Sequence, residues 1–191
     1  MRKLIHIPLA HTYEELCAFE KMIGKKPIRY PEREDEIERY LKNVEIELNK
    51  TKIHRIYVDT LFQDTEEERR NHINYYLKKG SKTHQLINNF MQKGGILEKT
   101  EDKILVFEGL SWANEYIKGN LSFGLVTDLR KDNLKDRDGF IGKRIDETLK
   151  DGECGALFIG GEHKPSFSKD IIVEKMILPD ILLKNPYQRN S

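Results

Sequence analysis

The chain has 191 residues, of which 34% are charged and 38% hydrophobic, and its 33 basic and 32 acidic side chains leave a net charge of +1. A chain of this length is expected to form one domain, and its balanced charge gives no field to hold a polyanion, so we predict no nucleic-acid partner. No apolar run approaches the roughly 18 residues of a membrane span, and the N-terminal apolar stretch is too short for a signal peptide. We therefore expect a cytoplasmic protein that does not bind membranes.

The N-terminal third of the sequence alternates between strand and helix patterns. Residues 3–8 have the pattern of a short buried strand, and Thr12 is suited to cap a helix that runs to about Ile23. A second helix is predicted from Pro31, because a proline in the first turn is followed by acids and then by apolar residues at helical spacing. Residues 54–59 form the second predicted strand.

The middle of the chain is mainly helical in pattern. Thr65 begins a capping-box sequence that starts one helix, and Ser81 starts another. Residues 101–118 are expected to be helical as well. We predict that the block 65–118 is a helical insert that caps the sheet or covers one of its faces. Residues 119–134 show no clear period, so no element is predicted there.

The C-terminal third returns to strands. A helix is predicted over residues 136–150, a strand over 155–160 and a last strand over 171–176, followed by a loose tail at 184–191. Strands that alternate with helices favour an α/β fold with a mostly parallel central sheet, flanking helices and the helical insert. The expected organisation is a single α/β domain over residues 1–191.

Two histidines lie just past the ends of predicted strands that are 150 residues apart. His11 follows the first strand, and His163 follows the strand at 155–160 after two glycines, which permit close approach of the backbone and a positive φ. Asp59 ends the second strand. Because ligands of open α/β sheets bind at the carboxyl ends of the strands, we predict that the three side chains share one site.

Each of these residues also has a simpler interpretation. His163 could be an exposed residue of a turn, and His11 could flank the helix that follows it. Asp59 could be a helix cap or a turn acid. His6 alternates within its strand, so we expect it to pack or hydrogen-bond inside the sheet.

The residue types at this edge are suited to water activation or to metal binding. An imidazole is a good general base because its ordinary pKa lies near neutrality. Asp59 could orient such an imidazole, act as a base or bind a metal. Two histidines and one carboxylate are also a familiar metal-binding set, which gives His11, Asp59 and His163 as the predicted ligands.

The predicted helix at 136–150 adds two arginines, Arg137 and Arg144, that lie seven residues apart. In one interpretation the aliphatic parts of both arginines flank the core and their guanidinium groups reach solvent. Asp138 is then an acid of the first helical turn that interacts favourably with the helix dipole. In the other, an arginine lies under the site and holds a carboxylate or a substrate anion. Arg137 is the candidate for that role.

One stretch of the chain resembles a known module. Arg137-Asp-Gly-Phe-Ile-Gly-Lys-Arg-Ile, a helix and then Ala156-Leu-Phe-Ile-Gly-Gly-Glu-His163 resemble the R-D-x-x-[MI]-A and strand-G-x-x-H module of the TraB/Tiki group. The end of the first strand, up to His11, resembles that group's first G-x-x-H with Pro8 in the glycine's place. Asp59 stands where the group typically has glutamate. The TraB/Tiki group is placed in one superfamily with the erythromycin esterases and the haem-uptake ChaN proteins.

This resemblance implies an α/β fold with a helical insert and a site built from His11, Asp59 and His163. The reactions within the superfamily differ, with metal-dependent peptide cleavage in Tiki-type members, metal-independent ester hydrolysis in erythromycin esterases and ligand binding in ChaN proteins. Membership would therefore leave the reaction open.

Three functions follow as hypotheses. The first is a hydrolase of a small-molecule or peptide substrate, in which His163 or His11 activates water with or without a divalent metal ion. The second is a non-catalytic module that holds haem, a metal or an anionic small molecule in the same pocket. The third is an interaction protein whose helical block 65–118 docks a partner. A homodimer stays open as its assembly.

Overall fold

The computed structural model describes residues 1–13, 16, 27–183 and leaves out 14–15, 17–26 and 184–191. The helix predicted from Thr12 to about Ile23 and the tail at 184–191 thus lie wholly or largely outside the described residues. Within the described part of the chain, no helix combines the length and the apolar character needed to cross a bilayer.

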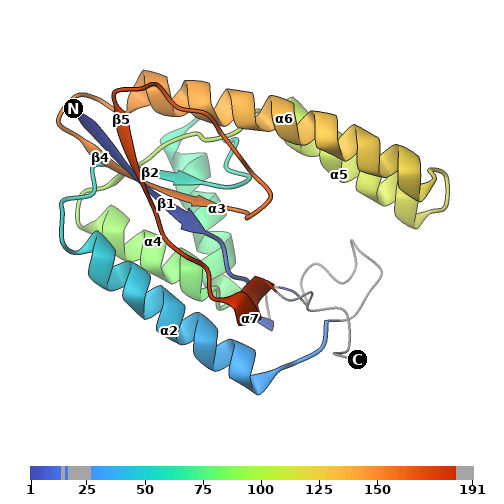
Figure 1. The fold of residues 1–191 in the computed structure, drawn as a ribbon, viewed down its shortest axis with the longest axis horizontal. Helices are drawn as coiled ribbons and strands as arrows, with labels where there is room; N and C mark the ends of the chain where they lie inside the picture. Colours follow the sequence, from blue (N-terminus) through green and yellow to red (C-terminus); the bar gives the residue numbers. More distant parts are fainter. Residues whose placement is uncertain (14–15, 17–26, 184–191) are drawn as a thin grey trace.

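A parallel sheet of five strands forms the centre of the fold, and it confirms the predicted α/β class (Figure 1). The strands are β1 (Arg2–Pro8), β2 (Arg55–Val58), β3 (Ile96–Leu97), β4 (Cys154–Ile159) and β5 (Ile171–Lys175), in the spatial order β3-β2-β4-β1-β5. Every neighbouring pair is parallel. All carboxyl ends therefore meet at one edge of the sheet.

Helices cover both faces of this sheet. They are α2 (Pro31–Leu48), α3 (Glu66–Lys78), α4 (Lys82–Gln92), α5 (Lys103–Ile117), α6 (Phe123–Thr148) and the short α7 (Asp180–Leu183). In Figure 1, α6 runs along one side of the sheet, and α2 and α4 lie on the other. α5 packs against the first half of α6, and this helical pair extends beyond the sheet.

The alternation of side chains along the strands sorts the core into two clusters. Ile5 and Phe158 belong to the cluster that packs against α2 and α4, whereas Leu4 and Leu157 belong to the cluster that packs against α6. Side chains two residues apart in a strand point to the same face. Residues at the carboxyl edge can therefore be assigned to the α6 face or to the opposite face from their register.

Local sequence signals determine where several of the helices begin. Pro31 occupies the first turn of α2, and Thr65 and Glu68 form both hydrogen bonds of a capping box at α3. Asp102 caps α5 by accepting hydrogen bonds from two backbone N–H groups of its first turn. This cap fixes the chain immediately after Glu101, which lies at the carboxyl edge.

Two parts of the fold differ from the sequence interpretation. Residues 119–134, for which no element was predicted, contain the first half of α6, which Ser122 caps. The helix predicted over 136–150 is thus the second half of a longer helix. β3 was not predicted, because a strand of two residues is too short to show a period.

Candidate functional site

Asp59 is fixed directly beyond the end of β2. Its backbone N–H donates to the carbonyl of Phe158 at 2.8 Å, which continues the β2–β4 pairing by one residue. Its Oδ2 accepts a hydrogen bond from the backbone N–H of Gly160 at 3.0 Å. A Cβ added at Gly160 would lie 3.1 Å from that oxygen, so any larger residue would crowd the carboxylate. Neither Gly160 nor Gly161 has a positive φ, so glycine is needed at position 160 because of this close approach and not because of its backbone conformation.

Glu101 is a second carboxylate at the same edge, and sequence reasoning missed it. It lies between β3 and α5, is completely buried, and its backbone N–H donates to the carbonyl of Leu61 at 3.0 Å. Its Oε1 accepts a hydrogen bond from the backbone N–H of Thr60 at 2.8 Å. Thr60 has a φ of 62°, a strained value for a β-branched residue. The backbone beside Asp59 is thus held in an unusual conformation by Glu101.

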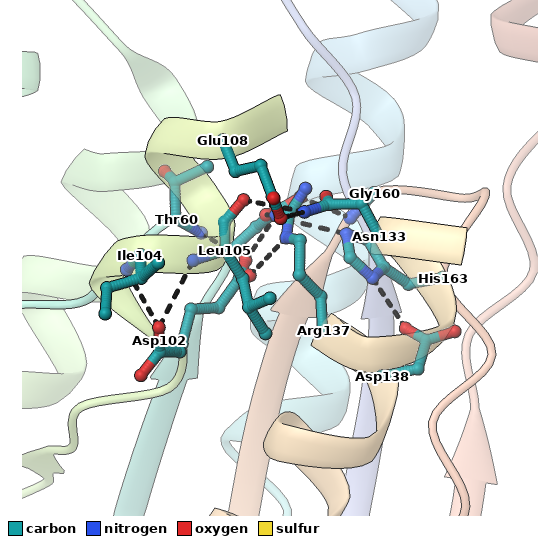
Figure 2. Close-up of polar contacts among 12 residues, drawn as sticks. Thr60, Asp102, Ile104, Leu105, Glu108, Asn133, Arg137, Asp138, Gly160 and His163 are labelled. Carbon is teal, nitrogen blue, oxygen red and sulfur yellow. Dashed lines mark hydrogen bonds and ion pairs between the residues drawn. The ribbon is translucent and has the colours of Figure 1, made fainter. Parts of the chain in front are cut away.

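Arg137 of α6 binds both carboxylates. Its Nε donates to Oε2 of Glu101 at 2.5 Å, and one terminal nitrogen donates to Oε1 of Glu101 at 2.6 Å and to Oδ1 of Asp59 at 3.0 Å (Figure 2). Of the two roles considered for the arginines, Arg137 takes the one in which it holds carboxylates. Arg144 instead pairs with Glu147 and donates weakly to the carbonyl of Lys99.

His163 is oriented by a carboxylate of the same helix. Its Nδ1 lies 2.6 Å from Oδ1 of Asp138, and the other oxygen of Asp138 accepts from the backbone N–H of Lys164 at 2.7 Å (Figure 2). An ionised carboxylate only accepts hydrogen bonds, so this contact places a proton on Nδ1. When the ring is neutral, its Nε2 is then an acceptor, and this nitrogen lies 3.8 Å from Oδ1 of Asp59.

The position of Asp138 corrects one sequence interpretation. Asp138 is not an acid of the first helical turn, because α6 begins at Phe123, four turns earlier at about 3.6 residues per turn. The helix dipole therefore does not explain this residue. Its two hydrogen bonds fix the imidazole of His163 and the start of the following loop.

The carboxyls of the half-buried Asp59 and the completely buried Glu101 differ in their tendency to ionise. Burial disfavours the ionised form of Asp59, but a hydrogen bond with Glu101 and the charges of His163 and Arg137 outweigh it and lower the pKa of Asp59. Burial raises the pKa of Glu101, Arg137 opposes that rise, and the neighbouring Asp59 adds to it. Glu101 is thus the member of the pair that takes up a proton first.

The described residues include one group that could hold a metal ion, made of Asp59, Glu101 and His163. One ligand atom from each lies within 4.8 Å of the others. Two of the three predicted ligands are in this group, and Glu101 is the third member. His11 lies three residues beyond β1, is half-buried and does not belong to the group. The participation of His11 stays a prediction.

The arrangement combines an oriented imidazole, two carboxyls of different acidity and a fixed cation at the carboxyl edge of a parallel sheet. Such a set can accept a proton from water, hold a cation or donate a proton to a leaving group. Comparisons of the chain with models of protein families, with curated protein sequences and with solved structures found no match.

Proposed function

We propose that the protein is a hydrolase in which His163 activates a water molecule at the carboxyl edge of the sheet. The observation that carries this proposal is the contact of Asp138 with Nδ1 of His163, because it turns Nε2 into an acceptor that faces Asp59. The 3.8 Å between Nε2 and Oδ1 of Asp59 is too long for a direct hydrogen bond, and it suits a water that contacts both atoms.

In this reaction each residue has a separate task. Nε2 of His163 takes a proton from the water as the water attacks an ester or amide carbonyl, and the carboxylate of Asp138 stabilises the imidazolium that forms. Asp59 orients the water. The imidazolium of His163 then returns that proton to the leaving group, while the buried Glu101 holds the backbone of Thr60 and the guanidinium of Arg137. Arg137 keeps the two carboxyls in position.

The same three residues fit a divalent metal ion. One imidazole and two carboxylates are suitable donors for zinc or manganese, and a carboxylate on the far nitrogen of a metal-binding histidine is a recurring arrangement. When bound, the metal would lower the pKa of its water towards neutrality. Arg137 already donates hydrogen bonds to oxygens of Asp59 and Glu101, so its positive charge would lower the affinity of the site for a metal ion.

Hydrolysis of chromogenic acetate esters, amino-acid amides and phosphate esters tests this proposal. We expect turnover of at least one class, and we expect His163→Gln to reduce it at least 100-fold without loss of the folded state, as judged by circular dichroism. Loss of turnover on chelation, with recovery on addition of Zn²⁺ or Mn²⁺, would identify the metal-dependent form. Turnover that resists chelation would identify the metal-free form.

His54→Gln is the matched control. His54 lies at the amino edge of the sheet, where its Nδ1 accepts a hydrogen bond from the backbone of Cys154. The control should keep the activity of the unmodified protein. Equal activity of His163→Gln and His54→Gln would overturn the proposal, and so would an absence of turnover in every substrate class with and without metal.

A further inference from the structure

The chemistry of the carboxyl edge changes from acidic to basic across the sheet. In strand order, Glu101 follows β3, Asp59 follows β2, His163 follows β4, His6 lies in β1 and Lys175 ends β5. The acidic half and His163 form the candidate site described above. The basic half, His6 and Lys175, has no role in that site.

His6 lies on the face of the sheet that α6 covers. It is two residues from Leu4, and its register partner in β4 is Leu157, both of which belong to the cluster packed against α6. Only 8% of His6 is exposed, and its imidazole makes no hydrogen bond to any residue in the described part of the chain. The prediction that His6 packs or hydrogen-bonds inside the sheet is confirmed for packing. The ring nitrogens of His6 are not among the buried polar atoms that lack a partner in the described residues, so they reach the surface, where a ligand could contact them.

Lys175 lies directly beside His6 on the neighbouring strand. The two are register partners, and Lys175 is on the α6 face because Ile171, four residues earlier, packs against that helix. Lys175 is exposed and forms no ion pair with any described residue. The adjacent acid Glu174 faces the other way and pairs with Lys3 at 2.9 Å. The ammonium is therefore not neutralised by its nearest carboxylate.

Two basic groups, His6 and Lys175, therefore lie side by side at this corner of the sheet. Burial, together with the neighbouring charge of Lys175, lowers the pKa of His6 to about 4, so its ring is neutral at pH 7. The acids that face His163 are Asp138, whose oxygens bind the His163 ring and the backbone N–H of Lys164, and Asp59, which Arg137 holds. Neither carboxylate is available to neutralise the positive charge of Lys175.

We propose that His6 and Lys175 form an anion-binding subsite that takes a carboxylate or phosphate group. Lys175 supplies the positive charge, and the neutral imidazole of His6 supplies one directed N–H donor, a combination that favours a small anionic group over a neutral one. Because this subsite adjoins His163, the substrate class would be esters or amides that carry an anionic group close to the bond that is cleaved. This statement about substrates rests on the proposed hydrolase function, whereas the binding of an anion does not.

Titration with inorganic phosphate and, separately, with acetate tests the subsite without any need for turnover. Isothermal calorimetry should detect binding of at least one of the two anions, and the resonances of the His6 ring should shift during the titration. Lys175→Met should weaken that binding tenfold or more, since a hydrogen bond to a charged group is typically worth at least that factor. His6→Asn, which keeps a donor of smaller reach, should weaken it less. Phosphate binding alone would indicate a phosphate-bearing ligand, and acetate binding alone a carboxylate.

Lys52→Met is the matched control, because Lys52 is an exposed lysine that precedes β2 at the amino edge. It removes the same charge and should leave anion binding unchanged. Equal loss in Lys52→Met and Lys175→Met, or no binding of either anion, would overturn the subsite. Because His163→Gln should still bind the anion, a protein that binds phosphate or acetate but never turns over a substrate would refute the hydrolase and leave the subsite standing.

Discussion

Asp138 and His163 come from different elements and meet through a hydrogen bond of 2.6 Å between Oδ1 and Nδ1. The second oxygen of Asp138 accepts from the backbone N–H of Lys164, so one carboxylate fixes both the ring and the chain that carries it. An asparagine at this position could keep only one of these contacts, because its amide group is a donor and would meet the N–H of Lys164. This relationship leads to the first prediction.

Asp138→Asn should lower both turnover and metal affinity by 10- to 100-fold, the usual effect of removing a carboxylate that orients a metal-binding or catalytic histidine. Asp128→Asn serves as the control, because Asp128 is an exposed aspartate of the same helix. Calorimetric titration with Zn²⁺ and the hydrolysis assay would measure the two effects. Equal behaviour of the two variants would mean that the orientation of His163 does not depend on Asp138.

Arg137→Met should destabilise the protein by about 3–5 kcal/mol at pH 7, because it leaves the buried Glu101 and the half-buried Asp59 without their shared cation. The deficit should shrink as the pH is lowered and the two carboxyls become protonated. Arg137→Lys keeps the charge but cannot reach both groups with a planar fork, so an intermediate loss is expected. Urea unfolding at pH 7 and pH 5 would measure this. A deficit that is the same at both pH values would contradict an electrostatic role.

Glu101 predicts a specific dependence of stability on pH. Its pKa in the folded protein is raised above the ordinary 4.5, so the folded state binds more protons than the unfolded state above pH 4.5. This group therefore contributes a loss of stability as the pH rises from 4.5 through its raised pKa. Glu101→Gln cannot ionise, so its free energy of unfolding should change less across that window. Urea unfolding at half-unit pH intervals would measure this difference. If the free energies of unfolding of Glu101→Gln and of the unmodified protein changed in parallel with pH, Glu101 would not have a raised pKa.

Much of the fold could be predicted from the sequence, because its signals are local. The capping box at Thr65 and the proline at the start of α2 depend on a few neighbouring residues, and both occur as expected. The meeting of Asp59 and His163 also followed from the sequence, since a parallel sheet brings the carboxyl ends of its strands to one edge.

The remaining parts of the site depend on contacts that no local pattern encodes. Glu101 lies four residues beyond the end of β3, and a strand of two residues shows no alternation that would mark the sheet edge. Asp138 has the appearance of a first-turn acid unless the helix is known to begin at Phe123.

The loop that carries His163 is held against α6 by a close approach at Gly142, and this gives a final prediction. A Cβ at Gly142 would lie 2.2 Å from the backbone oxygen of Ser166, so alanine would force the loop away from the helix. Gly142→Ala should therefore cost about 1–3 kcal/mol of stability and displace His163 from Asp138, with reduced turnover and metal affinity.

Gly139→Ala on the same helix is the control, because nothing lies within 4 Å of a Cβ at that exposed position. It should stabilise the protein by up to ~1 kcal/mol through the better helix propensity of alanine, and it should leave the site unchanged. Thermal unfolding and the imidazole resonances of His163 would measure both variants. If Gly142→Ala were as stable as Gly139→Ala and kept the His163 resonances, the loop would not depend on this contact for its position.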